Sequence, residues 1–229
     1  MQALRIVRHV RDNLVRHGAR AALHDIGCRA LNVLTDFQIL NGMTVRLRDV
    51  HSPQFFEAPG FHGRFVSAEE LAKTYENAHE LSSAFLREAG IRGDRCYAMF
   101  DGDVLASYGW YSDQPCEIEL ADFVLHFDPA YTYMYKGYTV PAYRGARLHA
   151  VGMCQALRAF TAEGKAGLIS YVQSNNFASL RSVARMGYRT FGKVYLLRAG
   201  SRTFVYATKS CRDYNFWVET AAGPCRGPR

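Results

Sequence analysis

Hydrophobic and polar residues alternate along some stretches of the chain and follow helical spacing in others. Tyr131, Tyr133 and Tyr135 occupy every second position of an aromatic, β-branched run, which is typical of a strand. Pro141 ends this run, because proline has no N–H to donate to a strand partner. A short basic turn follows, and after it the apolar positions approximate helical spacing: Leu148, Val151, Met153, Leu157 and Phe160. The pattern therefore predicts a strand, a tight turn and a helix.

The first 31 residues form a basic arm, with apolar residues at helical spacing and arginines between them. Gly18 should interrupt this helix, and a second short helix is expected over 19–26. One interpretation is a helix that packs on the rest of the protein. The other is an amphipathic helix that rests on anionic lipid or on an acidic protein partner.

Two local motifs predict elements in the next part of the chain. Asn41-Gly42 lies between two β-like runs and predicts a hairpin with strands near 34–40 and 43–49. The Ser67-to-Glu70 spacing is that of a capping box, which predicts one helix from there to Gly90.

A loop is expected over 51–66, which holds two prolines, two glycines and four phenylalanines, among them Phe55, Phe56 and Phe61. Those rings either line a substrate cleft or pack under a neighbouring helix. The remaining elements are a hairpin over 95–113, strands over 117–127, 168–172, 194–198 and 203–208, and a helix over 176–186. A tail begins at 210, and its Tyr214, Phe216 and Trp217 should dock on the domain.

Composition limits the class of protein. With 229 residues, 48% of them hydrophobic, the chain suits one domain with additions. No run approaches the roughly 18 apolar residues of a membrane span, and no signal peptide is visible. The six cysteines are scattered without a C-x-x-C, so we expect no metal site, no disulfide framework and a reducing cytoplasm.

The net charge of +7 predicts an anionic partner. Nucleic acid is disfavoured, because no basic run is interleaved with aromatic residues. The turn before the second helix suits a phosphate or diphosphate better: the first N–H groups of a helix lack partners inside it, and Arg144 and Arg147 add charge. An ordinary turn with two solvated arginines is the alternative.

Two stretches in this order resemble the GNAT superfamily of N-acetyltransferases, over roughly residues 40–209. In that family a strand, a Val-x-x-x-Arg-Gly-x-Gly-x-Gly/Ala loop and a helix precede a strand-Asn-helix unit that ends in Gly-Phe or Gly-Tyr. The matching residues are Val140, Arg144, Gly145, Leu148, Asn176, Ser179, Gly187 and Tyr188.

The resemblance implies an α+β (mixed α/β) fold with a mostly antiparallel, twisted central sheet of six to eight strands flanked by helices. It also implies three segments: the arm over 1–31, a GNAT-like acyltransferase domain over 32–209 and the tail over 210–229. The implied activity is transfer of an acetyl or other acyl group from coenzyme A to a primary amine of a small molecule or amino sugar.

The resemblance also implies the residues that hold the cofactor. Backbone N–H groups of the loop would bind the coenzyme A diphosphate, and Val140, Asn176 and Ser179 would face its pantetheine arm. The full set of expected cofactor residues is Thr139, Val140, Arg144, Gly145, Ala146, Arg147, Leu148, His149, Asn176 and Ser179. Asn176 could equally be a plain helix N-cap, or serve both purposes.

The chain departs from the family pattern at three positions: Arg147 replaces a glycine, His149 replaces a glycine or alanine, and Val183 replaces the tyrosine that can protonate the leaving thiolate. Ser182 is the neighbouring candidate for that proton, although the thiolate can also leave without one at neutral pH.

The general base is not marked by a carboxylate on the central strand. Tyr135 could orient a water that takes the amine proton, and the alternatives are the side chains Glu117, Glu119, Asp122 and His126. Two alternative functions stay open. One is transfer of a longer acyl chain from acyl carrier protein, whose acidic surface the basic arm could dock. The other is a degenerate domain that binds an acyl cofactor, a partner or a membrane without turnover.

Overall fold

The structure is a computed structural model, and it describes residues 14–15, 18–118 and 123–220. The α-helices are α2 (Ala19–Leu31), α3 (Ala68–Tyr75), α4 (Ser83–Arg92), α5 (Leu148–Ala162) and α6 (Phe177–Arg185). The strands are β1 (Asp36–Val45), β2 (His62–Val66), β3 (Arg95–Asp101), β4 (Val104–Ser112), β5 (Cys116–Glu117), β6 (Phe123–His126), β7 (Tyr131–Thr139), β8 (Gly167–Gln173), β9 (Arg189–Ala199), β10 (Arg202–Ala207) and β11 (Trp217–Thr220). Short 3-10 turns lie at Leu47–Asp49, Pro53–Phe55, Pro141–Tyr143 and Lys209–Tyr214.

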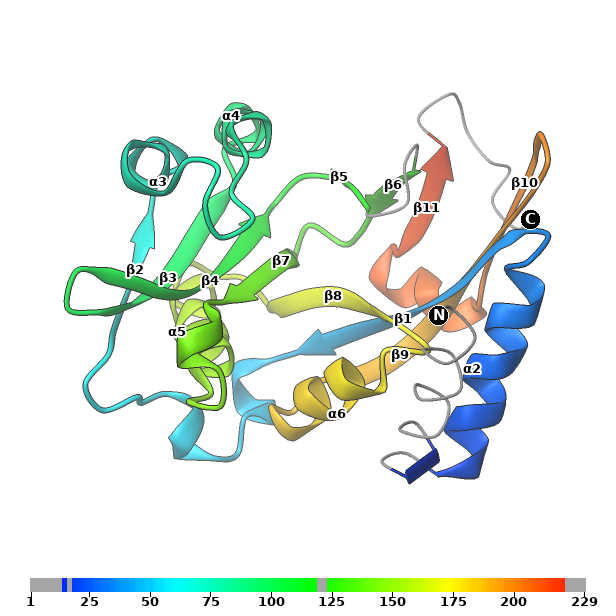
Figure 1. Cartoon of the computed structure of the whole chain (residues 1–229), viewed down its shortest axis with the longest axis horizontal. Coiled ribbons are helices and arrows are strands. Elements are labelled where there is room, and N and C mark those ends of the chain that lie inside the picture. Colours follow the sequence, from blue (N-terminus) through cyan, green and yellow to red (C-terminus); the bar gives the residue numbers. More distant parts are fainter. Residues whose placement is uncertain (1–13, 16–17, 119–122, 221–229) are drawn as a thin grey trace, which may run out of the picture.

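Eight strands form the main sheet, in the order β10-β9-β1-β8-β7-β4-β3-β2 (Figure 1). Neighbouring strands run antiparallel except β7 and β8, which are parallel. Helices pack on both faces, so the predicted mixed fold with a mostly antiparallel sheet of six to eight strands is confirmed.

The two faces of the sheet have separate cores. α5 covers one face, where its buried residues pack with Met43, Val45 and Leu168 of the central strands. α3 and α4 cover part of the other face over β3 and β4, above the sheet in Figure 1. The buried Trp110 lies in this second core, with the Phe85 ring edge-on to it at 5.2 Å.

The predicted hairpin at Asn41-Gly42 is wrong, because both residues lie inside the continuous strand β1. β1 pairs with β8 along one edge and β9 along the other, so its backbone groups are satisfied without a turn. Gly42 is used for close packing: a Cβ there would lie 2.6 Å from the Phe191 ring. The register with β9 shifts at this point, which is the usual place for a glycine in a strand.

The predicted helix from Ser67 to Gly90 is also wrong, because it is two helices. Ser67 caps α3 by accepting the Glu70 N–H, but α3 ends at Tyr75 and Ser82 caps a new helix, α4. The connection holds three residues with positive φ: Asn77, His79 and Glu80. Such a backbone cannot continue a right-handed helix.

The expected single strand over 117–127 is replaced by a hairpin. β5 and β6 pair antiparallel, with Cys116 opposite Leu125, and β11 adds a third strand to this small sheet. Phe216, just before β11, is fully buried, and Tyr214 stacks on Phe191 at 4.1 Å. The aromatic residues after 210 thus pack on the domain, as predicted.

Another difference lies in the expected loop over 51–66, whose last five residues form β2 and pair with β3. Phe55 is buried and Phe56 lies under the Arg158 guanidinium, so these rings pack against the α5 core.

The N-terminal arm is described from Gly18 onwards, apart from residues 14–15. Gly18 has a φ of 84° and immediately precedes α2, so it does interrupt helical structure; α2 runs past the expected end at 26, to Leu31. His24 of α2 hydrogen-bonds the Ser174 hydroxyl at 2.8 Å, which holds the helix near the end of β8. In the described ranges, no helix is both long enough and apolar enough to span a bilayer. The expected helix over residues 1–13 lies outside the described residues.

Candidate active site

The central strands β7 and β8 part soon after they meet. Only three residue pairs join them, from Tyr131 with Gly167 to Tyr133 with Ile169. Just beyond, the Ser170 hydroxyl donates to the Met134 carbonyl at 2.8 Å, and residues 135–139 of β7 pair with no residue of β8. The sheet therefore has a strand edge in its middle whose backbone groups can bind an extended ligand.

The N-terminus of α5 lies where β7 ends. Val151 N–H makes the first helical bond, to the Arg147 carbonyl at 3.0 Å, so the N–H groups of Leu148, His149 and Ala150 come before the ladder begins. No side chain caps the helix, and its first turn has no acidic residue. An uncapped helix start of this kind attracts an anion, because its N–H groups and the helix dipole both carry positive charge there.

The turn before the helix has the backbone of a glycine-rich loop. Gly145 has a φ of 92°, and Arg147, where the resembled family most often has glycine, has a φ of 61°. Arg147 thus adopts the left-handed conformation that glycine would adopt without strain. The loop therefore has left-handed backbone at two positions, Gly145 and Arg147, and the Arg147 guanidinium lies beside the helix start.

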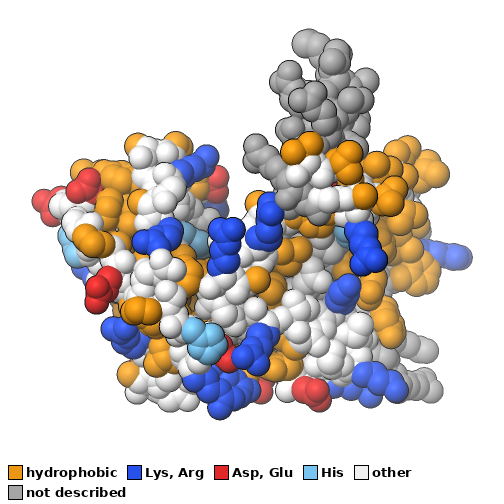
Figure 2. All heavy atoms as spheres, turned by 90° about the horizontal axis from the view of Figure 1, so that it is seen from below, with side chains coloured by type: hydrophobic (Ala, Val, Ile, Leu, Met, Phe, Trp, Pro, Cys, Tyr) orange, Lys and Arg blue, Asp and Glu red, His pale blue; other side chains and the backbone are white. Residues whose placement is uncertain are grey.

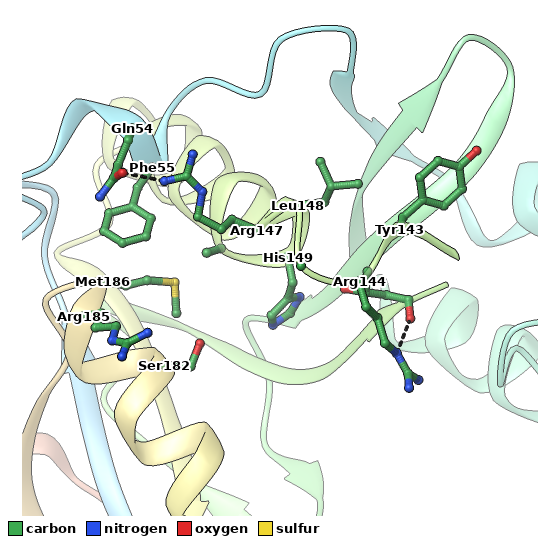
Figure 3. Close-up of a pocket in the computed structure, with 13 residues that line it drawn as sticks. Gln54, Phe55, Tyr143, Arg144, Arg147, Leu148, His149, Ser182, Arg185 and Met186 are labelled. Carbon is green, nitrogen blue, oxygen red and sulfur yellow. Dashed lines mark hydrogen bonds between the residues drawn. The ribbon is translucent and has the colours of Figure 1, made fainter. Parts of the chain in front are cut away.

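A groove of about 410 Å³ opens at this helix start. Figure 3 shows side chains from the turn, α5, the 3-10 turn at Pro53–Phe55 and α6 around it. The lining residues are Gln54, Phe55, Thr139, Tyr143, Arg144, Gly145, Arg147, Leu148, His149, Ala150, Ser182, Arg185 and Met186. Three of them are arginines and none is acidic, so the groove is an electropositive pocket suited to phosphate groups.

The arginines stand at the walls of the groove. Arg147 donates to the Gln54 side chain, and Arg144 Nε donates to the Thr139 carbonyl at 3.4 Å (Figure 3). Figure 2, which views the molecule from below, shows lysine and arginine side chains spread over that face with isolated acidic ones between them. The arginines of the groove thus belong to a chain with an excess of positive charge, +7 overall.

His149 faces inward from the first turn of α5. Its ring fills the space over Gly137, where a Cβ would lie 2.2 Å from His149 Cε1. Burial lowers the pKa of this imidazole, and a hydrogen bond to the backbone of Tyr108 acts in the opposite direction. The lowered pKa favours the neutral ring at pH 7, so His149 fills space at the groove and hydrogen-bonds the Tyr108 backbone rather than adding charge.

The groove brings together most of the residues expected to hold a cofactor. Those on its lining are Thr139, Arg144, Gly145, Arg147, Leu148, His149 and, from the expected catalytic pair, Ser182. Val140 and Ala146 lie in the same turn off the lining, and their N–H groups bond the carbonyls of Ala106 and Tyr143. Asn176 caps α6 by accepting the Ser179 N–H at 3.1 Å, and neither residue lines the groove.

Ala150, the last of the backbone N–H groups expected to hold the diphosphate, also lines the groove. Sequence reasoning did not assign the other lining residues to the cofactor: Gln54, Phe55, Tyr143, Arg185 and Met186. Arg185 could have been predicted from the sequence, because it follows Ser182 by three positions and so lies on the same face of the helix. Gln54 lies about 90 residues earlier in the chain, and no local pattern connects it to the turn.

Tyr135 lies in a second pocket, of about 230 Å³, on the opposite face of the sheet from α5. Its hydroxyl donates to Asp94 Oδ2 at 2.8 Å, and Arg92 pairs with the same carboxylate at 2.8 Å. Burial, and next the charge of Asp94, raise the pKa of the Tyr135 phenol well above its usual range. The phenol therefore stays protonated, and only its oxygen lone pairs remain to accept a hydrogen bond from water or an amine.

The other candidate bases are separated in space. Glu117 lines the same second pocket as Tyr135. His126 hydrogen-bonds Glu219 at 2.7 Å and stacks on Trp217 in the small sheet. Glu119 and Asp122 lie outside the described residues.

Comparisons with known proteins bear on the fold. No protein-family model matches the chain, and no match was found among the curated proteins searched. The solved structures similar to it include a GCN5-related N-acetyltransferase-like protein from Streptococcus suis, with 12% identity, a TM-score of 0.47 and coverage of 78% of this chain and 68% of that chain. A GCN5-related N-acetyltransferase from Kribbella flavida has 15% identity, a TM-score of 0.46 and coverage of 77% and 64%.

A third similar structure is a tandem GNAT protein from the clavulanic acid biosynthesis pathway, with 16% identity, a TM-score of 0.48 and coverage of 83% and 55%. The chain therefore spans between 55% and 68% of the length of these three structures. The GNAT-like resemblance predicted from the two motifs is found again among these structures over part of the chain. The likeness concerns the fold, and the chemistry of the site depends on its own residues.

Proposed function

We propose that the chain is an N-acyltransferase that uses a coenzyme A thioester and passes its acetyl or other acyl group to a primary amine of a small molecule or amino sugar. The observation that carries this proposal is the uncapped start of α5, ringed by Arg144, Arg147 and Arg185, beside the unpaired edge of β7. An anion site and a free strand edge in one place suit a ligand that has a diphosphate and an amide-containing arm.

The residues present fit this cofactor. The N–H groups of Leu148, His149 and Ala150 would hold the diphosphate, with the arginines neutralising its charge. Residues 135–139 of β7, at a rise of about 3.3 Å each, would offer about 16 Å of edge to the amides of the pantetheine arm. When bound, coenzyme A supplies an activated acyl group on sulfur.

This chain's own residues would place the amine and the thioester against each other where β7 and β8 part. Holding the amine and the thioester in the reactive orientation can by itself supply much of the rate acceleration of acyl transfer. Tyr135, on the far side of the gap, would accept a hydrogen bond from the incoming amine or from a water that takes its proton. Ser182, on the wall of the groove, would donate a hydrogen bond toward the sulfur end or the phosphates.

A thermal-shift measurement tests cofactor binding. At one hundred times its dissociation constant, acetyl-CoA should stabilise the protein by about 2.7 kcal/mol, which is a rise in Tm of about 5–10 °C for a chain of this length. Pantetheine, which lacks the diphosphate, should raise Tm much less at the same concentration. An unchanged Tm with acetyl-CoA, at concentrations up to the millimolar range, contradicts the proposal.

Turnover needs its own test, because a domain that binds an acyl cofactor without transfer is the second candidate. It is favoured by the Tyr135 hydroxyl, which is engaged with Asp94, and by the absence of acidic residues from the groove lining. Release of thiol from acetyl-CoA should be followed over a panel of amines. Turnover above the hydrolysis background with any amine rejects the binding-only candidate.

The donor can be tested in the same assay. Acyl carrier protein is the alternative donor, and its acidic surface would suit the arginines that line the groove. Comparing acetyl-CoA and longer acyl-CoA with acyl-carrier thioesters at equal concentration distinguishes them.

The basic arm, residues 1–31, is proposed to contact such a partner or an anionic membrane surface. Removing residues 1–30 should then reduce binding to anionic liposomes or to the carrier. We propose a cytoplasmic location, in keeping with five buried cysteines that are free thiols among the described residues.

A further inference from the structure

The second pocket lies against the gap between β7 and β8, on the face opposite α5. Tyr133 and Tyr135 of β7 and Tyr171 of β8 form one wall, and Phe85 of α4 forms another. The Tyr133 and Tyr171 rings are stacked with centroids 6.5 Å apart, and those of Tyr133 and Tyr135 are 6.0 Å apart. Rings from both strands thus flank the point where the strands separate.

The charges in this pocket are not equivalent. Its two cations already have anionic partners: Arg92 pairs with Asp94 at 2.8 Å, and Lys136 pairs with Glu80 at 3.5 Å. Glu88 of α4 and Glu117 of β5 also line the pocket, and both are solvent-exposed. Within the described residues, neither of these two carboxylates forms a salt bridge.

Aromatic faces and uncompensated carboxylates favour the same kind of ligand. A ring stacks on tyrosine and phenylalanine side chains, and a cation is attracted both by their π faces and by carboxylates. A cationic ligand would gain a modest attraction from Glu88 and Glu117, which a neutral ligand would not.

We propose that this pocket is the acceptor site and that it selects a primary amine carried on a flat aromatic body. The partly exposed Phe85 and Tyr171 rings would hold the body, and the Glu88 and Glu117 carboxylates would attract the ammonium. The inference rests on the proposed acyl transfer, since it names the acceptor class for that reaction. The phenol oxygen of Tyr135 lies in the same pocket, where it can accept a hydrogen bond from the amine nitrogen.

The experiment measures amine binding directly, without cofactor, by calorimetry or ligand-observed NMR. The probes are 2-phenylethylamine, its neutral isostere 2-phenylethanol, the aliphatic diamine putrescine and glucosamine. 2-Phenylethylamine should bind most tightly. Glu88→Gln and Glu117→Gln should each weaken its binding about two- to fivefold, as expected for exposed charge pairs, and leave 2-phenylethanol unchanged.

Two further variants test the aromatic wall, and one serves as a control. Tyr171→Leu should weaken the binding of 2-phenylethylamine about two- to tenfold, whereas Tyr171→Phe, which keeps the ring, should retain most of it. Glu69→Gln removes the same charge from the exposed first turn of α3, outside the pocket, and should change nothing. Circular dichroism and Tm confirm that each variant is folded.

The inference fails if 2-phenylethylamine binds no better than 2-phenylethanol or glucosamine, or if Glu88→Gln and Glu117→Gln match Glu69→Gln. These outcomes are separate from failure of the proposed function. Acetyl-CoA binding and turnover with some other amine would overturn only the acceptor class. Amine binding without any response to acetyl-CoA would instead overturn the transferase.

Discussion

Removing positive charge from the groove should weaken coenzyme A binding by an amount that the structure allows us to estimate. Arg147→Gln and Arg185→Gln each replace a guanidinium of the lining with a neutral amide. A charge pair about 4 Å apart is worth about 1 kcal/mol in water and about 4 kcal/mol near a protein surface. Because both side chains are exposed, the lower figure applies, so we expect a loss of about fivefold in Kd for each.

The double variant should lose about 25-fold if the two arginines act independently. Calorimetry with coenzyme A measures this. Arg202→Gln controls for the change in net charge, because Arg202 is exposed, lies on the edge strand β10 and does not line the groove. The differences should shrink between 0.1 M and 1 M salt, where the screening length falls from about 10 Å to about 3 Å.

Two results would refute this reasoning. If the double variant binds coenzyme A as the unmodified protein does, the groove is not the diphosphate site. If Arg202→Gln weakens binding equally, only the overall charge matters. Pantetheine provides an internal check, since its affinity should not respond to any of these substitutions.

Three other substitutions test the packing, the backbone and the pH response. Gly42→Ala places a Cβ 2.6 Å from the Phe191 ring and should destabilise the protein by about 1–3 kcal/mol in denaturant unfolding. Arg147→Gly relieves a left-handed residue and should raise Tm by about 2–4 °C while it weakens coenzyme A binding, which calorimetry and a thermal melt separate. Burial lowers the pKa of His149 in the folded protein. As the pH falls below about 6.5, the usual pKa of histidine, the unfolded chain binds a proton at His149 more readily than the folded protein does, so the free energy of unfolding decreases. His149→Asn should reduce this decrease, measured by denaturant unfolding between pH 5 and pH 8.

The sequence predicted the parts of the site that are local in the chain. Strand, Arg-Gly turn and helix are consecutive, so periodicity and the effect of Pro141 on a strand were sufficient to place them. The left-handed backbone at Gly145 and Arg147 also belongs to this short stretch. The resemblance to a family added the cofactor type, which no pattern of apolar residues could supply.

The sequence-based predictions were wrong where the local structure depends on pairing with strands that are distant in the chain. Asn41-Gly42 has the composition of a hairpin turn, but pairing with β8 and β9 on both edges outweighs that local preference. The second pocket draws residues from α4, β5, β7 and β8, which are separated by up to about 85 positions. No sequence motif relates Glu88 to Tyr171, because the two meet only through the order of the strands in the sheet.

The brief contact between β7 and β8 has a mechanical meaning. With three residue pairs at the centre, the sheet consists of two four-stranded halves, β10-β9-β1-β8 and β7-β4-β3-β2, with a seam between them. α5 packs on β3, β4 and β7 of one half and on β8 of the other, so this helix connects the two halves of the sheet. A ligand that orders the first turn of α5 would therefore restrict the motion of both halves of the sheet.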